Sequence, residues 1–174
     1  NNSRSGIIAA LEGSMRRLKT DYVDLYQIQW PNPEIPIDET ISTLEKLVSD
    51  GKIKYFGVGN FSSDQISQAL LSAKSENLIA AQTEYDLFNR EIEKGYIDLT
   101  TSKNISIIAY LSHGKDLFNE NEKKLLDNLS NKYEVSIRSI ILNWIISKKN
   151  ILVLTSSMSK EHTKQNYLSG QFKM

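Results

Sequence analysis

The sequence predicts an α/β protein built on a parallel sheet, and three observations point to this fold class. Five apolar runs are rich in β-branched or aromatic residues and are each too short for a helix. Amphipathic stretches with helical spacing separate these runs, which is the pattern of successive βα units. A polar residue follows each apolar run, at the carboxyl end of the expected strand, where parallel sheets bind their ligands.

The composition is that of one globular domain covering residues 1–174. Apolar residues make up 40% and charged residues 24% of the chain, and the 21 basic residues balance the 21 acidic residues. A net charge of zero does not favour nucleic acid or an anionic membrane as a partner. The absence of cysteine excludes disulfides and thiolate metal sites, and no metal site is expected. No run could span a bilayer and no signal-peptide pattern is present, so a cytoplasmic location is expected.

The first helix is followed by a strand at Val23–Ile28, which Pro31 closes because proline has no N–H to give to a sheet ladder. Asp38 is expected to cap the next helix, and Gly51 to follow it in the left-handed conformation. The predicted buried stripes of these two helices are Ile7, Leu11, Met15 and Leu18, and Ile41, Leu44, Leu47 and Val48.

The second predicted strand is Ile53–Val58, and Gly59-Asn60-Phe61 forms its tip. Ser62 and Gln65 have the spacing of a capping box, which opens a helix. The expected inward positions of that helix are Ile66, Ala69, Leu70 and Ala73. Leu78–Ala81 is the third predicted strand, with Gln82 at its tip.

The second half of the chain repeats the pattern. A helix through Ile92, Tyr96 and Leu99 precedes a strand at Ile105–Ala109 that ends at Tyr110. Two further helices follow, and Ser136 caps the second. Ile151–Leu154 is the fifth strand, and Ser159 caps a last helix towards Leu168. The tips of the five strands are Gln29, Asn60, Gln82, Tyr110 and Ser156 with Ser157. Such a rim is typical of a ligand site, although an Asn or Ser after a strand is also a common turn residue or helix cap.

Three groups of residues resemble the aldo-keto reductase family. The first is Arg16-Arg17-Leu18-Lys19-Thr20-Asp21-Tyr22-Val23-Asp24-Leu25-Tyr26-Gln27-Ile28 with Trp30-Pro31. The second is Gly51-Lys52-Ile53 with Gly57-Val58-Gly59-Asn60-Phe61-Ser62. The third is Gln82-Thr83-Glu84-Tyr85 with Asn89-Arg90. They occur in the family's order and spacing over nearly the whole chain.

The resemblance implies a partial TIM barrel, an α/β fold whose five parallel strands match strands four to eight of a (βα)8 barrel. It also implies NAD(P)H-dependent reduction of a small aldehyde or ketone, with NADP(H) as the expected cofactor and NAD(H) as the alternative. The family's catalytic Asp, Tyr and Lys belong to the first three barrel strands, which have no counterpart here. Gln29 stands at the position of the fourth catalytic residue, a histidine, and an amide cannot titrate near neutral pH.

The same resemblance implies roles for individual residues. Asn60 and Gln82 would bind the nicotinamide carboxamide, Tyr110 would stack on the ring, and Gly59 replaces a family serine. Trp30 would line the substrate mouth, with a core plug at the barrel rim as the alternative. The phosphate end would comprise Ser156, Ser157, Lys160, His162 and Asn166. His162 is alternatively an exposed helical residue, and His113 is expected to be a solvated loop residue. Asp116 replaces a family glycine and would disfavour a phosphate unless Lys115 compensates.

Two other functions stay open beside the reductase. One is a non-catalytic member of this family that binds a nucleotide or a partner, which Gln29 and Asp116 favour. The other is a truncated gene product. The strands at Val23–Ile28 and Ile151–Leu154 would each have a bare edge, and unpaired apolar edges recruit other chains. Self-association through these edges is therefore expected.

Overall fold

Strands and helices alternate along the chain, as the sequence predicts. The computed structural model describes residues 2–111 and 118–174. The strands are β1 Val23–Ile28, β2 Ile53–Gly59, β3 Leu78–Glu84, β4 Ser106–Tyr110 and β5 Ile151–Leu154. The helices are α1 Arg4–Leu18, α2 Ile37–Ser49, α3 Ser63–Ser72, α4 Tyr96–Ser102, α5 Glu120–Tyr133, α6 Ile137–Ile146 and α7 Lys160–Leu168, with a 3-10 turn η1 at Glu91–Glu93.

The five strands form one parallel sheet in which they follow one another in chain order. Tyr26 pairs with Phe56 and Ile28 with Val58 across β1 and β2. Gly59 pairs with Gln82 across β2 and β3, after a register shift between Phe56 and Gly57. The order makes β1 and β5 the two edge strands, as expected from the sequence.

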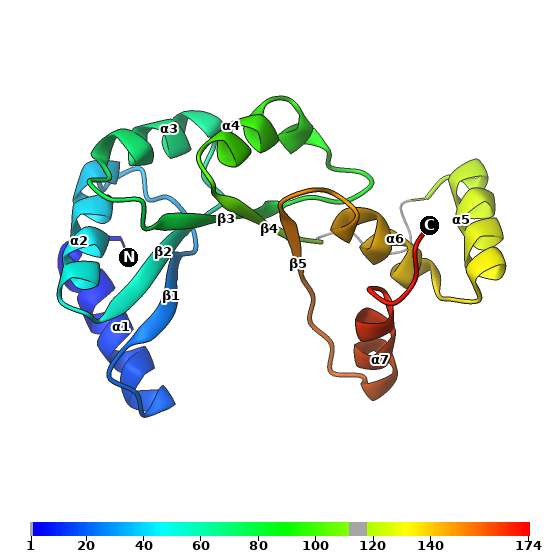
Figure 1. The fold of residues 1–174 in the computed structure, drawn as a ribbon, viewed down its shortest axis with the longest axis horizontal. Helices are drawn as coiled ribbons and strands as arrows, with labels where there is room; N and C mark the ends of the chain where they lie inside the picture. The colour runs from blue at the N-terminus through cyan, green and yellow to red at the C-terminus, as the bar shows by residue number, and fades with distance from the viewer. Residues whose placement is uncertain (1, 112–117) are drawn as a thin grey trace. The chain divides into compact units, whose positions relative to one another are not determined.

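The chain divides into two compact units. The first unit comprises Asn1–Thr83 and Gly95–Ile107, and the second comprises Glu84–Lys94 and Ile108–Met174. In the first unit, α1, α2 and α3 lie along one side of β1, β2 and β3 (Figure 1). Its core is built from fully buried aliphatic and aromatic side chains, among them Ile41, Leu44, Phe56, Val58 and Ile66. The single domain expected over residues 1–174 stays a prediction.

The second unit is held together by contacts of α6 with β5, α5 and α7. Leu142 and Ile145 of α6 are buried in its core. The buried amide of Asn143 donates hydrogen bonds to the carbonyl oxygens of Ser169 and Phe172, both at 2.7 Å. One side chain of α6 therefore fixes the end of α7 and the residues that follow it.

Local signals in the sequence identify several helix ends correctly. Ser62 and Gln65 form the expected capping box of α3. Ser136 caps α6 and Ser159 caps α7, each by accepting a backbone N–H three residues on. Gly51 has φ +68°, as expected after α2.

Other boundaries were predicted wrongly. The N-cap of α2 is Pro36 and not Asp38, which lies in the first helical turn. Pro36 makes no side-chain cap hydrogen bond, and Asp38 instead stabilises the first turn by placing an acidic side chain at the positive end of the helix dipole. The predicted helix through Ile92, Tyr96 and Leu99 is two elements, η1 and α4, because Gly95 between them has φ +100°.

Two further predictions need correction. Gln82 is not beyond the third strand but within it, because β3 pairs with β2 as far as Gln82 and ends at Glu84. The predicted buried stripe of α1 is limited to Ile7 and Leu11, whereas Leu18 is 67% exposed. Leu18 is the last residue of its helix, followed by the left-handed cap Lys19, so the helix ends before this side chain is covered.

Candidate functional site

Asn60 connects three strand ends in the first unit. Its backbone N–H donates to the carbonyl oxygen of Gln82 at 2.7 Å, and its side-chain Nδ2 donates to the carbonyl oxygen of Gln29 at 3.0 Å. Asn60 has φ +59°, a left-handed conformation that asparagine tolerates better than most residues. Asn60 therefore has a structural role in addition to any role in ligand binding, because it fixes the end of β2 to the neighbouring strands.

Gly59 permits the close approach that this arrangement needs. A Cβ atom on Gly59 would lie 2.6 Å from the carbonyl oxygen of Gln29 and 2.9 Å from that of Ile28. No side chain fits there without moving the backbone of the β1 end. The glycine at this position is thus explained by packing, and a serine hydroxyl could not be placed here in this backbone arrangement.

Trp30 is 59% exposed, so the alternative of a core plug is wrong. Its carbonyl oxygen accepts a hydrogen bond of 2.8 Å from the Asn2 side chain, which fixes the backbone where β1 ends. Trp30 lines a cavity of about 360 Å³ beside β1. Gln27 and Gln29 also line it, and the buried Oε1 of Gln27 has no hydrogen-bond partner among the described residues. The cavity therefore offers an indole and neutral amides, which suit a polar, uncharged or planar ligand.

In the second unit, Tyr110 ends β4 and is half-buried. Its carbonyl oxygen accepts a hydrogen bond of 3.1 Å from the backbone N–H of Tyr85. Burial raises the pKa of the Tyr110 phenol, and the nearby Glu84 carboxylate raises it further. Tyr110 therefore stays neutral around pH 7 and presents an aromatic ring with a polar end.

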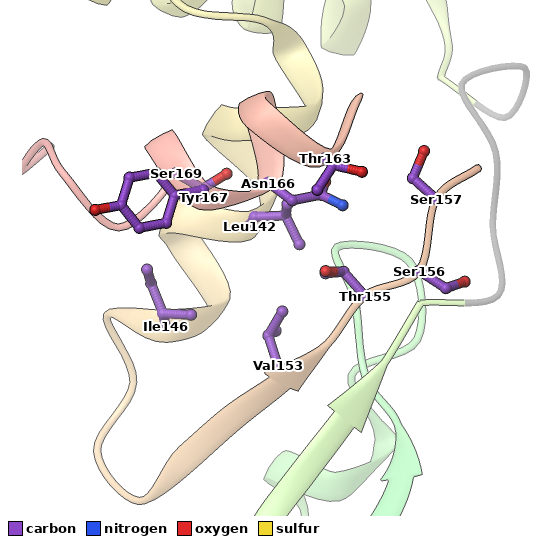
Figure 2. A pocket seen from close by; sticks show the side chains of 10 residues that line it. All are labelled: Leu142, Ile146, Val153, Thr155, Ser156, Ser157, Thr163, Asn166, Tyr167 and Ser169. Atoms are coloured by element: carbon purple, nitrogen blue, oxygen red, sulfur yellow. The ribbon is translucent and has the colours of Figure 1, made fainter. Parts of the chain in front are cut away.

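A second cavity, of about 620 Å³, lies between α6, β5 and α7. Figure 2 shows its ten lining side chains, with the hydroxyls of Thr155, Ser156 and Ser157 on the segment that leaves β5. Thr163, Asn166 and Ser169 add polar groups from α7 and its end, and Leu142, Ile146, Val153 and Tyr167 complete the lining. The lining carries hydroxyl and amide groups but no charged side chain, so it suits neutral polar groups such as sugar hydroxyls.

The structure brings three of the five residues predicted for the phosphate end to this cavity. Ser156, Ser157 and Asn166 line it, whereas Lys160 and His162 are exposed in the first turn of α7 and do not. The Asn166 Oδ1 accepts a hydrogen bond of 2.8 Å from Arg138 Nε, so this amide also joins α7 to α6. The Ser157 hydroxyl accepts the N–H of Ser159 at 3.0 Å, which stabilises the turn before the helix.

The predicted site residues are divided between the two units. Gln29, Trp30, Asn60 and Gln82 belong to the first, and Tyr110, Ser156, Ser157, Lys160, His162 and Asn166 to the second. The predictions for His113, Lys115 and Asp116 lie outside the described residues.

Within residues 2–111 and 118–174, no group of His, Asp and Glu side chains is arranged to hold a metal ion. None of the helices in this part of the chain is both long and apolar enough to cross a membrane.

Sequence reasoning missed a polar cluster around the buried Tyr85 in the second unit, formed by Tyr85, Arg90, Glu93, Trp144 and Lys148. The Tyr85 hydroxyl donates to Glu93 Oε1 at 2.6 Å, and the Tyr85 and Trp144 rings lie 5.3 Å apart. The only signal in the sequence is an Arg and a Glu three residues apart, which more often marks an exposed ion pair. Thr155, Thr163 and Ser169 were also missed, because small hydroxyl residues carry no chemical signature of their own.

The described residues fit parts of a nicotinamide nucleotide. In the first unit, Asn60 follows β2 and Gln82 lies within β3, and a backbone hydrogen bond joins the two residues. Their side-chain amides carry the donors and acceptors that a carboxamide needs. In the second unit, Tyr110 offers a ring, and the hydroxyl-lined cavity offers partners for ribose or phosphate oxygens. Both sets of side chains are neutral, so any affinity would come from hydrogen bonds and stacking more than from charge.

Comparisons with known proteins show the family of the chain. The model of the Aldo/keto reductase family matches residues 1–174. Methylglyoxal reductase YeaE of Escherichia coli is 28% identical over 162 residues, which cover 91% of this chain and 57% of that protein.

The chain is also similar to two solved structures. The first is the thermostable aldo-keto reductase Tm1743 in complex with the inhibitor epalrestat, with 31% identity, a TM-score of 0.92 and coverage of 99% of this chain and 63% of that one. The second is an aldo/keto reductase from Klebsiella pneumoniae in complex with NADP and acetate, with 26% identity, a TM-score of 0.87 and coverage of 99% and 62%.

These matches confirm the expected fold class, because the five-stranded sheet corresponds to part of a TIM barrel. The chain spans 57 to 63% of the length of these three relatives.

Proposed function

Because the chain belongs to the aldo/keto reductase family, we propose that it supplies nicotinamide-binding residues of an NADP(H)-dependent carbonyl reductase. The observation that carries the proposal is the position of Asn60, whose two hydrogen bonds join the ends of β1, β2 and β3. This arrangement orders the Asn60 side-chain amide and the Gln82 backbone before any ligand arrives, which lowers the entropic cost of binding. The cytoplasmic location expected from the sequence is part of the same proposal.

Each residue has a definite role in this proposal. Asn60 and Gln82 bind the carboxamide, and the Tyr110 ring stacks on the nicotinamide. Ser156, Ser157 and Asn166 contact ribose and phosphate oxygens from the lining of their cavity. Lys160 and His162 stand in the first turn of α7, where the Lys160 charge adds a longer-range attraction for phosphate. NADP is bound by the similar Klebsiella protein, which supports NADP(H) as the cofactor, with NAD(H) as the alternative.

The bound cofactor would supply the hydride that reduces a small aldehyde or ketone. Gln29 would donate a hydrogen bond to the carbonyl oxygen and orient it, while the exposed Trp30 ring would lie beside the substrate. Gln29 can neither give nor take a proton at neutral pH, so the proton that the carbonyl oxygen needs must come from another group. This point favours a second candidate, a family member that binds the nucleotide without reducing a carbonyl.

A titration with NADPH tests the proposal. The Trp30→Phe variant leaves Trp144 as the single tryptophan, and binding is followed by quenching of its fluorescence and by energy transfer to the nicotinamide. We expect saturable binding that is weakened about tenfold or more by Gln82→Ala and by Tyr110→Ala, since each removes a hydrogen-bonding or stacking contact. Gln68→Ala, an exposed glutamine on α3, is the matched control and should leave the affinity unchanged.

The outcomes separate the candidates. No binding at millimolar NADPH would overturn the cofactor assignment for this chain. Binding together with oxidation of NADPH by methylglyoxal would support the reductase, whereas binding without turnover over a panel of aldehydes and ketones would favour the non-catalytic candidate.

A further inference from the structure

The second unit contains a polar cluster that the proposed function does not use, in which the buried Tyr85 meets the exposed ion pair of Arg90 and Glu93. Tyr85 is completely buried, and its hydroxyl donates to Glu93 Oε1 at 2.6 Å. Arg90 pairs with the same carboxylate through two bonds, Nε to Oε1 at 3.0 Å and Nη2 to Oε2 at 2.7 Å. The two carboxylate oxygens thus accept three hydrogen bonds in a forked geometry that fixes the Glu93 side chain.

Trp144 of α6 forms the other side of this Tyr85 cluster. Its ring centroid lies 5.3 Å from that of Tyr85, and the Arg90 Cζ and the Lys148 Nζ lie 5.5 Å and 4.6 Å from it. These are distances at which aromatic pairs and cation–π contacts stabilise. The segment Glu84–Lys94 is therefore held on α6 by stacking and by charge, and not only by its own turn.

The ionisation states in the cluster are fixed around neutral pH. The hydrogen bond from Arg90, followed by the one from Tyr85, lowers the pKa of the Glu93 carboxyl. Burial, followed by the bond to Glu93, raises the pKa of the Tyr85 phenol. At neutral pH the Glu93 carboxylate is therefore an acceptor and the Tyr85 hydroxyl a donor.

The cluster reaches Tyr110 through one backbone hydrogen bond. The N–H of Tyr85 donates to the carbonyl oxygen of Tyr110 at 3.1 Å, at the end of β4. We propose that the Tyr85 cluster positions Tyr110: by holding Tyr85 in place, it fixes the backbone at the end of β4 from which the ring assigned to the nicotinamide projects. This inference rests on the proposed function for its consequence in binding, but the positioning itself is a property of the second unit alone.

A different result is expected if the cluster only stabilises the fold. Disrupting it would then lower the free energy of unfolding but leave the environment of the Tyr110 ring unchanged in the folded protein. The experiment therefore reads Tyr110 directly, by the NMR signals of ring-13C-labelled tyrosine, with the Tyr110 signal assigned by its loss in Tyr110→Phe. All measurements are made well below the unfolding midpoint of each variant.

Two conservative variants perturb the cluster. Tyr85→Phe removes the hydroxyl but keeps the ring against Trp144 and the backbone N–H. Glu93→Gln removes the charge with little change of shape. Glu91→Gln is the matched control, because Glu91 forms an ion pair with Lys94 in the same segment and is 75% exposed.

We expect Tyr85→Phe and Glu93→Gln to shift the Tyr110 signals and to weaken NADPH binding about three- to tenfold, as the loss of one charge-assisted hydrogen bond would. Glu91→Gln should change neither. Unchanged Tyr110 signals in both cluster variants would overturn the proposal, whether or not stability falls, and so would an equal shift in Glu91→Gln. If the unmodified chain does not bind NADPH, the proposed function fails, while the Tyr110 signals still decide whether the cluster positions this residue.

Discussion

The carbonyl oxygen of Gln29 lies 2.6 Å from the place where a Cβ atom on Gly59 would be. The strand ends of β1 and β2 therefore approach each other at a distance that only glycine allows. Asn60 depends on this approach, because its side chain donates to the same Gln29 oxygen.

We predict that Gly59→Ala destabilises the protein by about 1 to 3 kcal/mol, because the backbone of one strand end must move to relieve the overlap. The measurement is urea or thermal unfolding followed by circular dichroism. Gly13→Ala is the control: Gly13 lies inside α1, and its nearest neighbour is the far end of the flexible Arg17 side chain. Alanine there should stabilise the helix by about 0.5 to 1 kcal/mol. An unfolding midpoint of Gly59→Ala equal to that of the parent would contradict the close approach.

We predict that Ser62→Ala lowers the free energy of unfolding by about 1 kcal/mol, since Ser62 accepts the N–H of Gln65 in the capping box of α3. Ser67→Ala is a suitable comparison, because Ser67 lies within the same helix and only donates back to Ser63. That control should stay within about 0.5 kcal/mol of the parent, as surface substitutions usually do. Equal losses in the two variants would argue against a specific capping role.

We predict that part of the stability is lost between about pH 10 and pH 12 through Tyr96. Burial raises the pKa of Tyr96 to about 12 from an ordinary value near 10. The unfolded chain therefore loses this proton first, so the protein is fully stabilised below pH 10 and loses stability as the pH rises towards 12.

Tyr96→Phe tests this origin of the alkaline loss. The Tyr96 hydroxyl is buried without a hydrogen-bond partner among the described residues, so its removal should leave the stability at pH 7 equal or raise it by up to about 1 kcal/mol. The slope of unfolding free energy against pH above 10 should become shallower. A variant with the same alkaline slope as the parent would show that other groups cause the loss.

We predict that the chain self-associates through the β5 edge, where Leu152 and Leu154 are 59% and 50% exposed. Leu152→Lys with Leu154→Lys should reduce association, because charged residues on an edge strand oppose pairing with another chain. Light scattering after size exclusion measures the mass. Leu71→Lys is the control, since Leu71 is 88% exposed but lies on α3. A parent chain that is monomeric at all accessible concentrations would exclude the prediction.

The regular part of the fold could be predicted from local patterns. The β5 bounds agree residue for residue with the apolar run Ile151–Leu154, and the caps at Ser62, Ser136 and Ser159 follow from side chains that bond their own helix. The division of the predicted helix at Gly95 and the extension of β3 to Glu84 could not be predicted, because they depend on a backbone conformation and on pairing with another strand.

The residues of the candidate site could also be predicted only where a local pattern marks them. Asn60 stands out in the sequence because a polar residue follows a buried strand, but its bonds to Gln29 and Gln82 join segments far apart in the chain. The Tyr85 cluster has no sequence signature, because Tyr85 and Trp144, which join the ordinary Arg90–Glu93 pair to α6, lie far apart in the chain. Such contacts need the tertiary structure.

The glycines of β2 have a consequence for how this sequence can diverge. A Cβ at Gly57 would lie 2.9 Å from the Ala80 carbonyl oxygen, and a Cβ at Gly59 would lie 2.6 Å from the Gln29 carbonyl oxygen. A library of random substitutions should therefore tolerate little change at either position, while the exposed faces of α3 and α7 accept many residues. A relative with a larger residue at the Gly59 position would then need a shifted β1 end, and a spectroscopic label on this chain would be better placed on those helices than on β2.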